Sequence, residues 1–179
     1  MVVAIALASF SSGYFLGSTN SGNSRPWLFR GAYAVYFVTE NGTSITGGSV
    51  SYNLTEKVMI LDFNSTEVQE RSNTNSTIAG VTNSTTTEWV PLNLLGDFET
   101  TAPPGLNLTG ISHVSLRIEG RQIECTLYRF SNPAENETAS SYFSDSAKFQ
   151  VESAFTLSTN GETINFTQVL VSSNIPGLS

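Results

Sequence analysis

Apolar and polar residues alternate with a period of two along most of this chain, and no other feature limits its fold as much. Along residues 148–159, for example, Phe149, Val151 and Phe155 would lie on one face and Gln150 on the other. Because side chains of a β-strand alternate between its faces, this spacing predicts half-buried strands. No helix start signal is followed by a 3.6-residue pattern. From Trp27 onward we therefore expect an all-β protein.

Turn signals divide this region into seven or eight short strands, which favours an Ig-like or pilin-like β-sandwich. The expected strands cover residues 32–37, 45–54, 57–63, 88–90, 112–119, 121–128, 148–159 and 163–172. Hairpin turns are expected at Glu40–Thr43, where Asn41-Gly42 would supply positive φ, and at Gly120. Asn132–Asn136 and Asn160-Gly161 are further turns. The Ser/Thr/Asn-rich tract 73–87 is expected to be a long loop.

Eight Asn-x-Thr triplets, each an N-glycosylation acceptor pattern, punctuate these segments. They begin at Asn41, Asn53, Asn64, Asn75, Asn83, Asn107, Asn136 and Asn165. Composition alone gives about four Asn-x-Ser/Thr triplets. Ser outnumbers Thr, 25 to 21, yet all eight end in Thr, which chance produces about two times in a thousand. This bias predicts covalent N-glycans and an outside-facing protein.

The charge and cysteine content limit which partners and which cellular location we expect for this protein. Only 13% of residues are charged and the net charge is −7, without any block of like charges. A nucleic-acid or anionic-lipid surface is therefore not expected. Cys125 is the single cysteine, so no intrachain disulfide can form, although secreted animal domains of this size usually carry them. An archaeal cell exterior fits better, and Cys125 itself is expected to be a small buried apolar residue.

Residues that could carry enzyme chemistry are sparse. His113 is the only histidine, and the three aspartates are far apart in sequence, so we expect no catalytic residues, no metal site and no cofactor. Glu119 and Glu124 could face each other across Gly120, but as solvated neighbours. Trp27 and Trp89 are expected in the core or at a strand edge. Lys57 and Lys148 are the only lysines; we expect them to protect strand edges, with a Lys–Asn isopeptide link as the less favoured interpretation.

Residues 1–16 form an uncharged apolar segment. No Lys or Arg precedes Arg25, so the positive region of a signal peptide is missing, and we expect this segment to begin a mature chain whose leader was cut upstream. As a strand it would span about 53 Å, with Val3, Ile5 and Leu7 on one face and small alanines on the other. As a helix it would span about 24 Å, short of the ~30 Å hydrocarbon core. We favour a strand and keep a helix as the alternative.

Residues 17–26 are a flexible polar linker ending in an extended Arg-Pro step. The chain is therefore expected to comprise an N-terminal donor strand (1–16), a linker (17–26) and a glycosylated β-sandwich head (27–179). An apolar strand on a tether is hazardous for a monomer. It is useful when inserted into the sheet of another copy.

This layout resembles pilins that polymerise by donor-strand complementation, and among them the archaeal thread-type surface filaments. The resemblance is one of architecture over the whole chain, without a short shared motif. It implies that Val3, Ile5, Leu7 and Phe10 plug a groove in the next subunit, which lacks one strand. It also implies a head-to-tail homopolymer outside the cell, without a stable membrane span, that serves adhesion or biofilm cohesion.

Two other functions fit the same residues. In a type IV pilin-like subunit, residues 1–16 would be a core helix of the filament. In a membrane-anchored surface glycoprotein, they would be an anchor. A sugar-binding module or an enzyme would require a carboxylate or aromatic cluster that only the fold could assemble.

Overall fold

The computed structural model describes residues 25–43, 48–76, 83–91, 105–159 and 162–178. These residues form nine β-strands and no helix, which confirms the all-β prediction. The strands are β1 (Tyr33–Thr43), β2 (Ser49–Phe63), β3 (Glu67–Ser76), β4 (Ser84–Pro91), β5 (Asn107–Ile118), β6 (Arg121–Asn132), β7 (Glu137–Ser144), β8 (Gln150–Thr159) and β9 (Glu162–Ser173).

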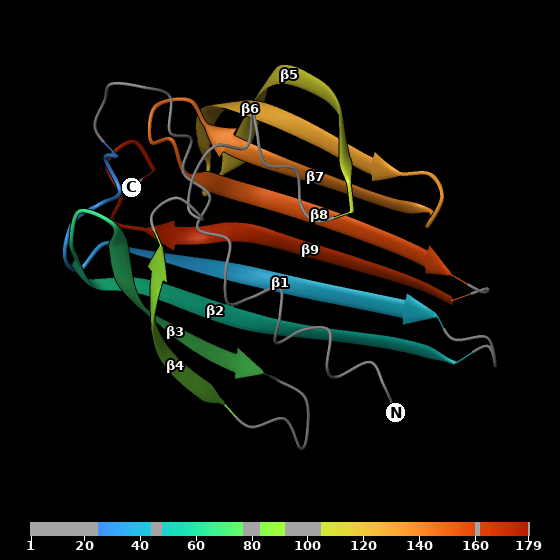
Figure 1. Ribbon diagram of the computed structural model, residues 1–179, viewed down its shortest axis with the longest axis horizontal. Helices are drawn as coiled ribbons and strands as arrows, with labels where there is room; N and C mark the ends of the chain where they lie inside the picture. Colours follow the sequence, from blue (N-terminus) through green and yellow to red (C-terminus); the bar gives the residue numbers. More distant parts are fainter. Residues whose placement is uncertain (1–24, 44–47, 77–82, 92–104, 160–161, 179) are drawn as a thin grey trace.

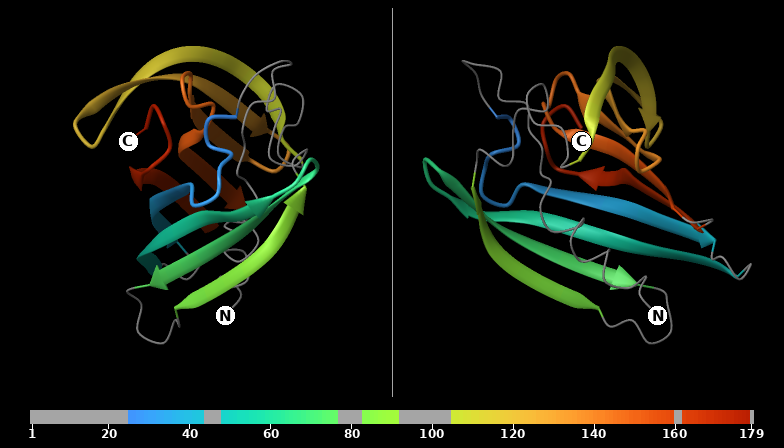
Figure 2. Two further views of the ribbon diagram at one scale, coloured as in Figure 1. Left: turned by 90° about the vertical axis from the view of Figure 1, so that its left-hand side faces the viewer. Right: turned by 45° about the vertical axis from the view of Figure 1, so that its right-hand side comes forward.

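All nine strands belong to one antiparallel sheet in the order β4-β3-β2-β1-β9-β8-β7-β6-β5. The first four strands make one meander and the last five make another, and the two meanders join in the middle where β1 pairs with β9. The sheet is strongly curved, so that its two halves bend around a shared interior (Figures 1 and 2). Sequence reasoning predicted a sandwich; here a single continuous sheet folds over its own core.

The main core lies on one face of this sheet, which we call the core face. On β1 it is lined by Ala34, Tyr36 and Val38, all of which are buried. Trp27, which precedes β1, packs against Phe149 with ring centroids 6.1 Å apart. A second, smaller buried cluster comprises Leu106, Tyr128, Phe130 and Phe143. We call it the β6–β7 cluster.

Two strands run further than the sequence pattern predicted. Asn41 and Gly42 were expected to turn the chain, but they lie inside β1 and are paired with neighbours on both sides. Residues 49–63 were expected to be parts of two strands, yet they form the single strand β2. Cross-strand pairing over the whole length of β1 and β2 outweighs the local turn preference of Asn-Gly.

The expected loop over residues 73–87 is also shorter than predicted. Its ends belong to β3 and β4, which pair from Glu67↔Pro91 to Thr74↔Ser84. The β5–β6 hairpin is confirmed, and its turn residues Glu119 and Gly120 have φ of 50° and 81°. The expected strand near the C-terminus is confirmed as β9, and Asn132 ends β6 at the predicted turn.

The predicted donor strand, residues 1–16, and most of the linker lie outside the described residues, as do the plugs Val3, Ile5, Leu7 and Phe10. The predicted turn at Asn160-Gly161 lies outside them as well. Among the described residues, no helix is long and apolar enough to cross a membrane.

Candidate glycan-bearing surface

The asparagines of all eight Asn-x-Thr triplets are exposed in the folded protein. This holds for those in strands (Asn41, Asn53, Asn75, Asn107 and Asn165) and for those in turns or beside strands (Asn64, Asn83 and Asn136). In a strand, alternate residues point to opposite faces. A strand asparagine whose side chain pointed to the core would be buried. None of the eight acceptor asparagines is in such a position.

Three of these asparagines lie in one row that crosses seven strands. Directly paired residues share a face of the sheet, and Asn41 on β1 pairs with Asn165 on β9. From this pair the row continues outward in both directions, and Asn107 ends it on β5. The row consists of Ser51, Asn41, Asn165, Thr156, Thr138, Ser131 and Asn107. Each member is Ser, Thr or Asn. On β1 and β9 the row lies on the face opposite the main core, which we call the outer face.

Neighbouring hydroxyls hold the side-chain oxygens of several acceptor asparagines. Ser51 donates to Oδ1 of Asn41 at 2.6 Å, and Thr156 donates to Oδ1 of Asn165 at 3.0 Å. In the β2–β3 turn, Oδ1 of Asn64 accepts from the backbone N–H groups of Thr66 and Glu67, both at 2.8 Å. Such contacts orient the amide through its oxygen. The amide nitrogen, which would carry a glycan, takes no part in these contacts.

The core face carries three buried glutamates that the sequence analysis did not identify. Glu40 accepts a hydrogen bond from the Tyr52 hydroxyl. Glu56 is 2% exposed and accepts from Ser72 at 2.7 Å. Glu70 is 4% exposed, and one of its carboxylate oxygens has no hydrogen-bond partner. These glutamates follow the period-two pattern of the core, so their burial is visible only once the register is known.

Burial raises the pKa of the Glu56 carboxyl to about 7, although the Ser72 hydroxyl opposes the shift. Burial also raises the pKa of Glu70 to about 7, with further contributions from the negative charges of Glu88 and Glu56. Burial removes water that would stabilise the charged form of a carboxyl group. Both groups are therefore protonated in mild acid.

Among the strands that the structure describes, β4 and β5 form the two edges of the sheet, and their exposed side chains differ. On β5, Leu108 and Ile111 are 39% and 51% exposed. They are paired with Phe130 and Tyr128 of the β6–β7 cluster, so they extend that cluster to the edge. On β4, Thr86 and Glu88 lie on the core face, opposite Ser72 and Glu70. The edge strand β5 thus exposes two large apolar side chains beside the β6–β7 cluster, whereas β4 exposes one, Trp89.

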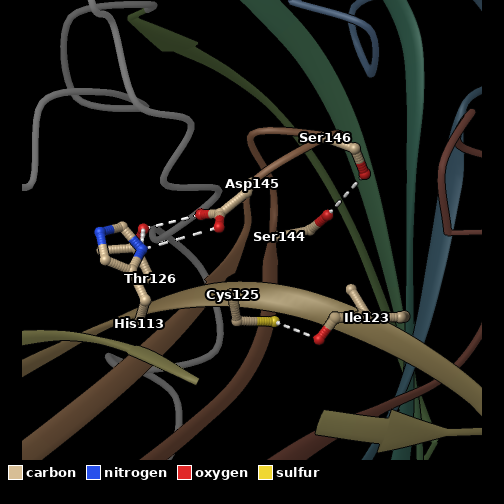
Figure 3. Close-up of polar contacts among 7 residues, drawn as sticks. All are labelled: His113, Ile123, Cys125, Thr126, Ser144, Asp145 and Ser146. Carbon is tan, nitrogen blue, oxygen red and sulfur yellow. Dashed lines mark hydrogen bonds and ion pairs between the residues drawn. The ribbon is translucent and has the colours of Figure 1, made fainter. Parts of the chain in front are cut away.

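Sequence reasoning expected no catalytic role for His113. It is on β5, and Nδ1 lies 3.8 Å from Oδ2 of Asp145 and 3.4 Å from the Thr126 hydroxyl (Figure 3). The Thr126 hydroxyl donates to Oδ1 of Asp145 at 2.7 Å. The Cys125 sulfur points away from this group toward the Ile123 carbonyl, at 3.5 Å. His113 is therefore not placed to activate the Cys125 thiol.

Cys125 is completely buried, as predicted. Burial, followed by the negative charges of Asp145, Glu124 and Glu152, raises the pKa of its thiol to about 12. A thiolate is the reactive form of cysteine. The Cys125 thiol is therefore unreactive in the folded protein.

The other residues that the sequence offered as candidates for chemistry do not form a common site. Glu124 is paired with Ser115, and Glu119 lies in the turn, so the two do not face each other across the hairpin. Lys57 lies with Nζ 4.6 Å from the centre of the Tyr33 ring. Trp27 is in the core and Trp89 is 45% exposed on β4. Within the described ranges, no cluster of three or more His, Cys, Asp or Glu could hold a metal ion.

Comparison with known proteins identifies no relative. No protein family matches this chain, and no curated protein matches it. Among solved structures, a DUF1329 family protein from Desulfovibrio piger aligns with 87% of this chain and 90% of its own. That alignment has a TM-score of 0.28 and 5% sequence identity.

Proposed function

We propose that this protein is the subunit of a glycosylated extracellular filament, assembled head to tail by donor-strand complementation. Residues 1–16 of one copy add to the sheet of the next copy as a further strand. The filament serves adhesion or biofilm cohesion at an archaeal cell surface. The observation that carries the proposal is the pair of exposed apolar side chains on the edge strand β5, Leu108 and Ile111, which an uncharged donor strand would cover.

The chemistry of the edge favours β5 as the acceptor. An exposed apolar edge strand invites pairing with another chain, and proteins that must stay monomeric protect such edges with charges or proline. Along β5, Leu108 and Ile111 are left exposed beside the β6–β7 cluster. A donor strand there would set Val3, Ile5, Leu7 or Phe10 against them. On β4, the same side chains would meet Glu88 and Thr86.

The expected energetics suit a stable fibre. Burying four apolar donor side chains gives roughly 6–12 kcal/mol before the entropic costs of association. Backbone hydrogen bonds along the edge add to this, as in other cases of strand addition. The donor and acceptor surfaces differ, so the contact is heterologous and need not close into a ring. It therefore propagates as a filament.

The exposed acceptor asparagines complete the proposal. Five of them lie in strands and three lie in turns or beside strands, so glycans would cover the outer face and the ends of the sheet. Such a coat would hinder lateral association between fibres and access by proteases. Asn107 lies on β5 itself, but on the face opposite Leu108, so the glycans would leave the Leu108 face of that edge available to the donor.

Negative-stain electron microscopy of the full chain beside a variant lacking residues 1–24 tests the assembly. The proposal predicts filaments from the full chain and soluble monomers from the truncated chain. A synthetic peptide of residues 1–16 should bind the truncated chain, because its β5 edge is free. Filaments from the truncated chain would overturn the donor role of residues 1–16.

Two further results would favour the alternatives. Circular dichroism that shows a helix of a dozen or more residues in the assembled fibre would identify a type IV pilin-like subunit. A full chain that forms no fibres and dissolves only in detergent would identify a membrane-anchored glycoprotein.

A further inference from the structure

The acceptor asparagines differ in how firmly the fold holds their backbone. Asn41-Gly42-Thr43 is paired on both sides, with residues 49–51 of β2 and residues 163–165 of β9. Asn165-Phe166-Thr167 is likewise paired on both sides, with β1 and with β8. Both triplets therefore lie in the middle of the sheet.

The triplet Asn64-Ser65-Thr66 is in a different position. It forms the turn between β2 and β3, and none of its residues takes part in the β2–β3 ladder. A single backbone bond, from Asn64 N–H to the Glu67 carbonyl at 2.9 Å, closes the turn. The other contacts of this turn involve the Asn64 side chain. All three asparagines are exposed, so exposure alone does not separate them.

The chemistry of glycan transfer makes this difference matter. In that reaction, Nδ2 of asparagine attacks the anomeric carbon of an oligosaccharide activated as a lipid-linked phosphate. A C–N bond forms, the bond between the sugar and the phosphate oxygen breaks, the lipid phosphate leaves, and Nδ2 gives up one proton. The transferase must enclose the Asn and Thr side chains together with the backbone between them. A segment whose backbone is hydrogen-bonded on both sides cannot enter such a site unless the sheet opens.

We infer that Asn41 and Asn165 receive their glycans before the sheet forms, whereas Asn64 remains an acceptor after folding. This inference rests on the proposed glycosylation, and it assigns an order to glycan transfer and folding. Because β1 and β9 join the two halves of the sheet, both asparagines must be modified before the meanders meet. The fraction of chains that carry glycans at these two asparagines would then depend on whether glycan transfer is faster than folding.

The test uses the full chain, produced without glycans and folded. The protein is incubated with a purified oligosaccharyltransferase that accepts Asn-x-Thr and with its lipid-linked oligosaccharide. Peptides of residues 36–48, 59–71 and 160–172 are the controls, because they carry the same triplets without the sheet. Mass spectrometry of glycopeptides gives the rate at each asparagine. A variant with Thr163→Pro serves as a second probe, since proline in a central strand removes a ladder hydrogen bond and leaves all three triplets intact.

We expect all three peptides to be modified, and Asn64 of the folded chain to be modified at a comparable rate. Asn41 and Asn165 of the folded chain should react at least about tenfold more slowly than their peptides, as local opening limits access. Thr163→Pro should accelerate both sites and leave Asn64 unchanged. Modification of Asn41 and Asn165 in the folded chain at the peptide rates would overturn the inference. Failure of all three peptides to accept a glycan would instead remove the glycosylation on which it rests.

Discussion

Asn41 on β1 lies directly opposite Asn165 on β9, at the line where the two meanders of the sheet join. Both residues begin Asn-x-Thr triplets, and both side chains are exposed on the outer face. Ser51 and Thr156 hold them through Oδ1 from the outer sides of the pair. Two acceptor sites thus share one cross-strand position.

Replacing both asparagines with aspartate should reveal their proximity as a non-additive loss of stability. Like charges at directly opposite positions of two antiparallel strands repel each other. In protein made without glycans, N41D/N165D should lose about 0.5–1 kcal/mol more free energy of unfolding than the sum of N41D and N165D. Urea unfolding of the four proteins measures this excess, and added salt should reduce it. Additive effects at low salt would show that the two side chains do not face each other.

The buried carboxyl groups of Glu56 and Glu70 should make the protein more stable in mild acid than at neutral pH. Folding raises the pKa of Glu56 and Glu70 from 4.5 to about 7. Between these values the folded state binds more protons than the unfolded state, so stability falls as the pH rises. The contribution is complete below about pH 4.5 and is lost as the pH rises through about 7. Each group should lose roughly 3 kcal/mol of stabilisation over this range.

Urea unfolding between pH 4 and pH 8 measures this dependence. Glu70→Gln should flatten the profile, because the amide does not ionise. Glu135→Gln, at an exposed position in the β6–β7 turn, is the matched control and should leave the profile unchanged. A stability that rises steadily from pH 4 to pH 8 would contradict the burial of these carboxyl groups.

The contact between Trp27 and Phe149 ties the segment before β1 to the segment before β8. Both side chains are 1% exposed. Phe149→Ala should therefore cost about 3–5 kcal/mol, through lost burial and the cavity it leaves. Phe63→Ala removes the same ring from a position that is 36% exposed, and should cost clearly less. Similar losses from both substitutions, measured by urea unfolding, would argue against this core.

The buried thiol gives a simple check on the sheet itself. Cys125 should react with a thiol reagent such as dithionitrobenzoate at pH 8 only very slowly in the folded protein, because it is buried and its pKa is raised to about 12. In urea, one thiol per chain should react at once. Immediate stoichiometric labelling without urea would mean that β6 is open to solvent.

Sequence patterns anticipated most of the strands but not how they assemble. The period-two spacing around Phe149 and Val151 located β8, and the Gly120 turn located the β5–β6 hairpin. By contrast, Asn41-Gly42 was misread as a turn, because the pairing that holds it inside β1 comes from residues more than a hundred positions away on β9. Local propensity does not contain such information.

The same limit applies to the candidate surface. The triplets predicted acceptor sites, and each acceptor asparagine is exposed. The row that joins Asn41, Asn165 and Asn107 depends on the order and register of seven strands. The burial of Glu56 and Glu70 could have been suspected from their alternation with Val58 and Val68, but a polar residue in an apolar phase is usually assigned to the surface. Both the asparagine row and the burial of these glutamates depend on how the strands pair, which the sequence pattern does not show.

The most direct test of the filament proposal compares the two edges of the sheet. Ile111→Lys places a charge on the apolar β5 edge, and Thr86→Lys places the same charge at an exposed core-face position of β4. Circular dichroism should show that both variants remain folded, and negative-stain electron microscopy then counts filaments. We predict filaments from Thr86→Lys and few or none from Ile111→Lys. Filaments from Ile111→Lys as abundant as those from the unmodified chain would contradict assembly through β5.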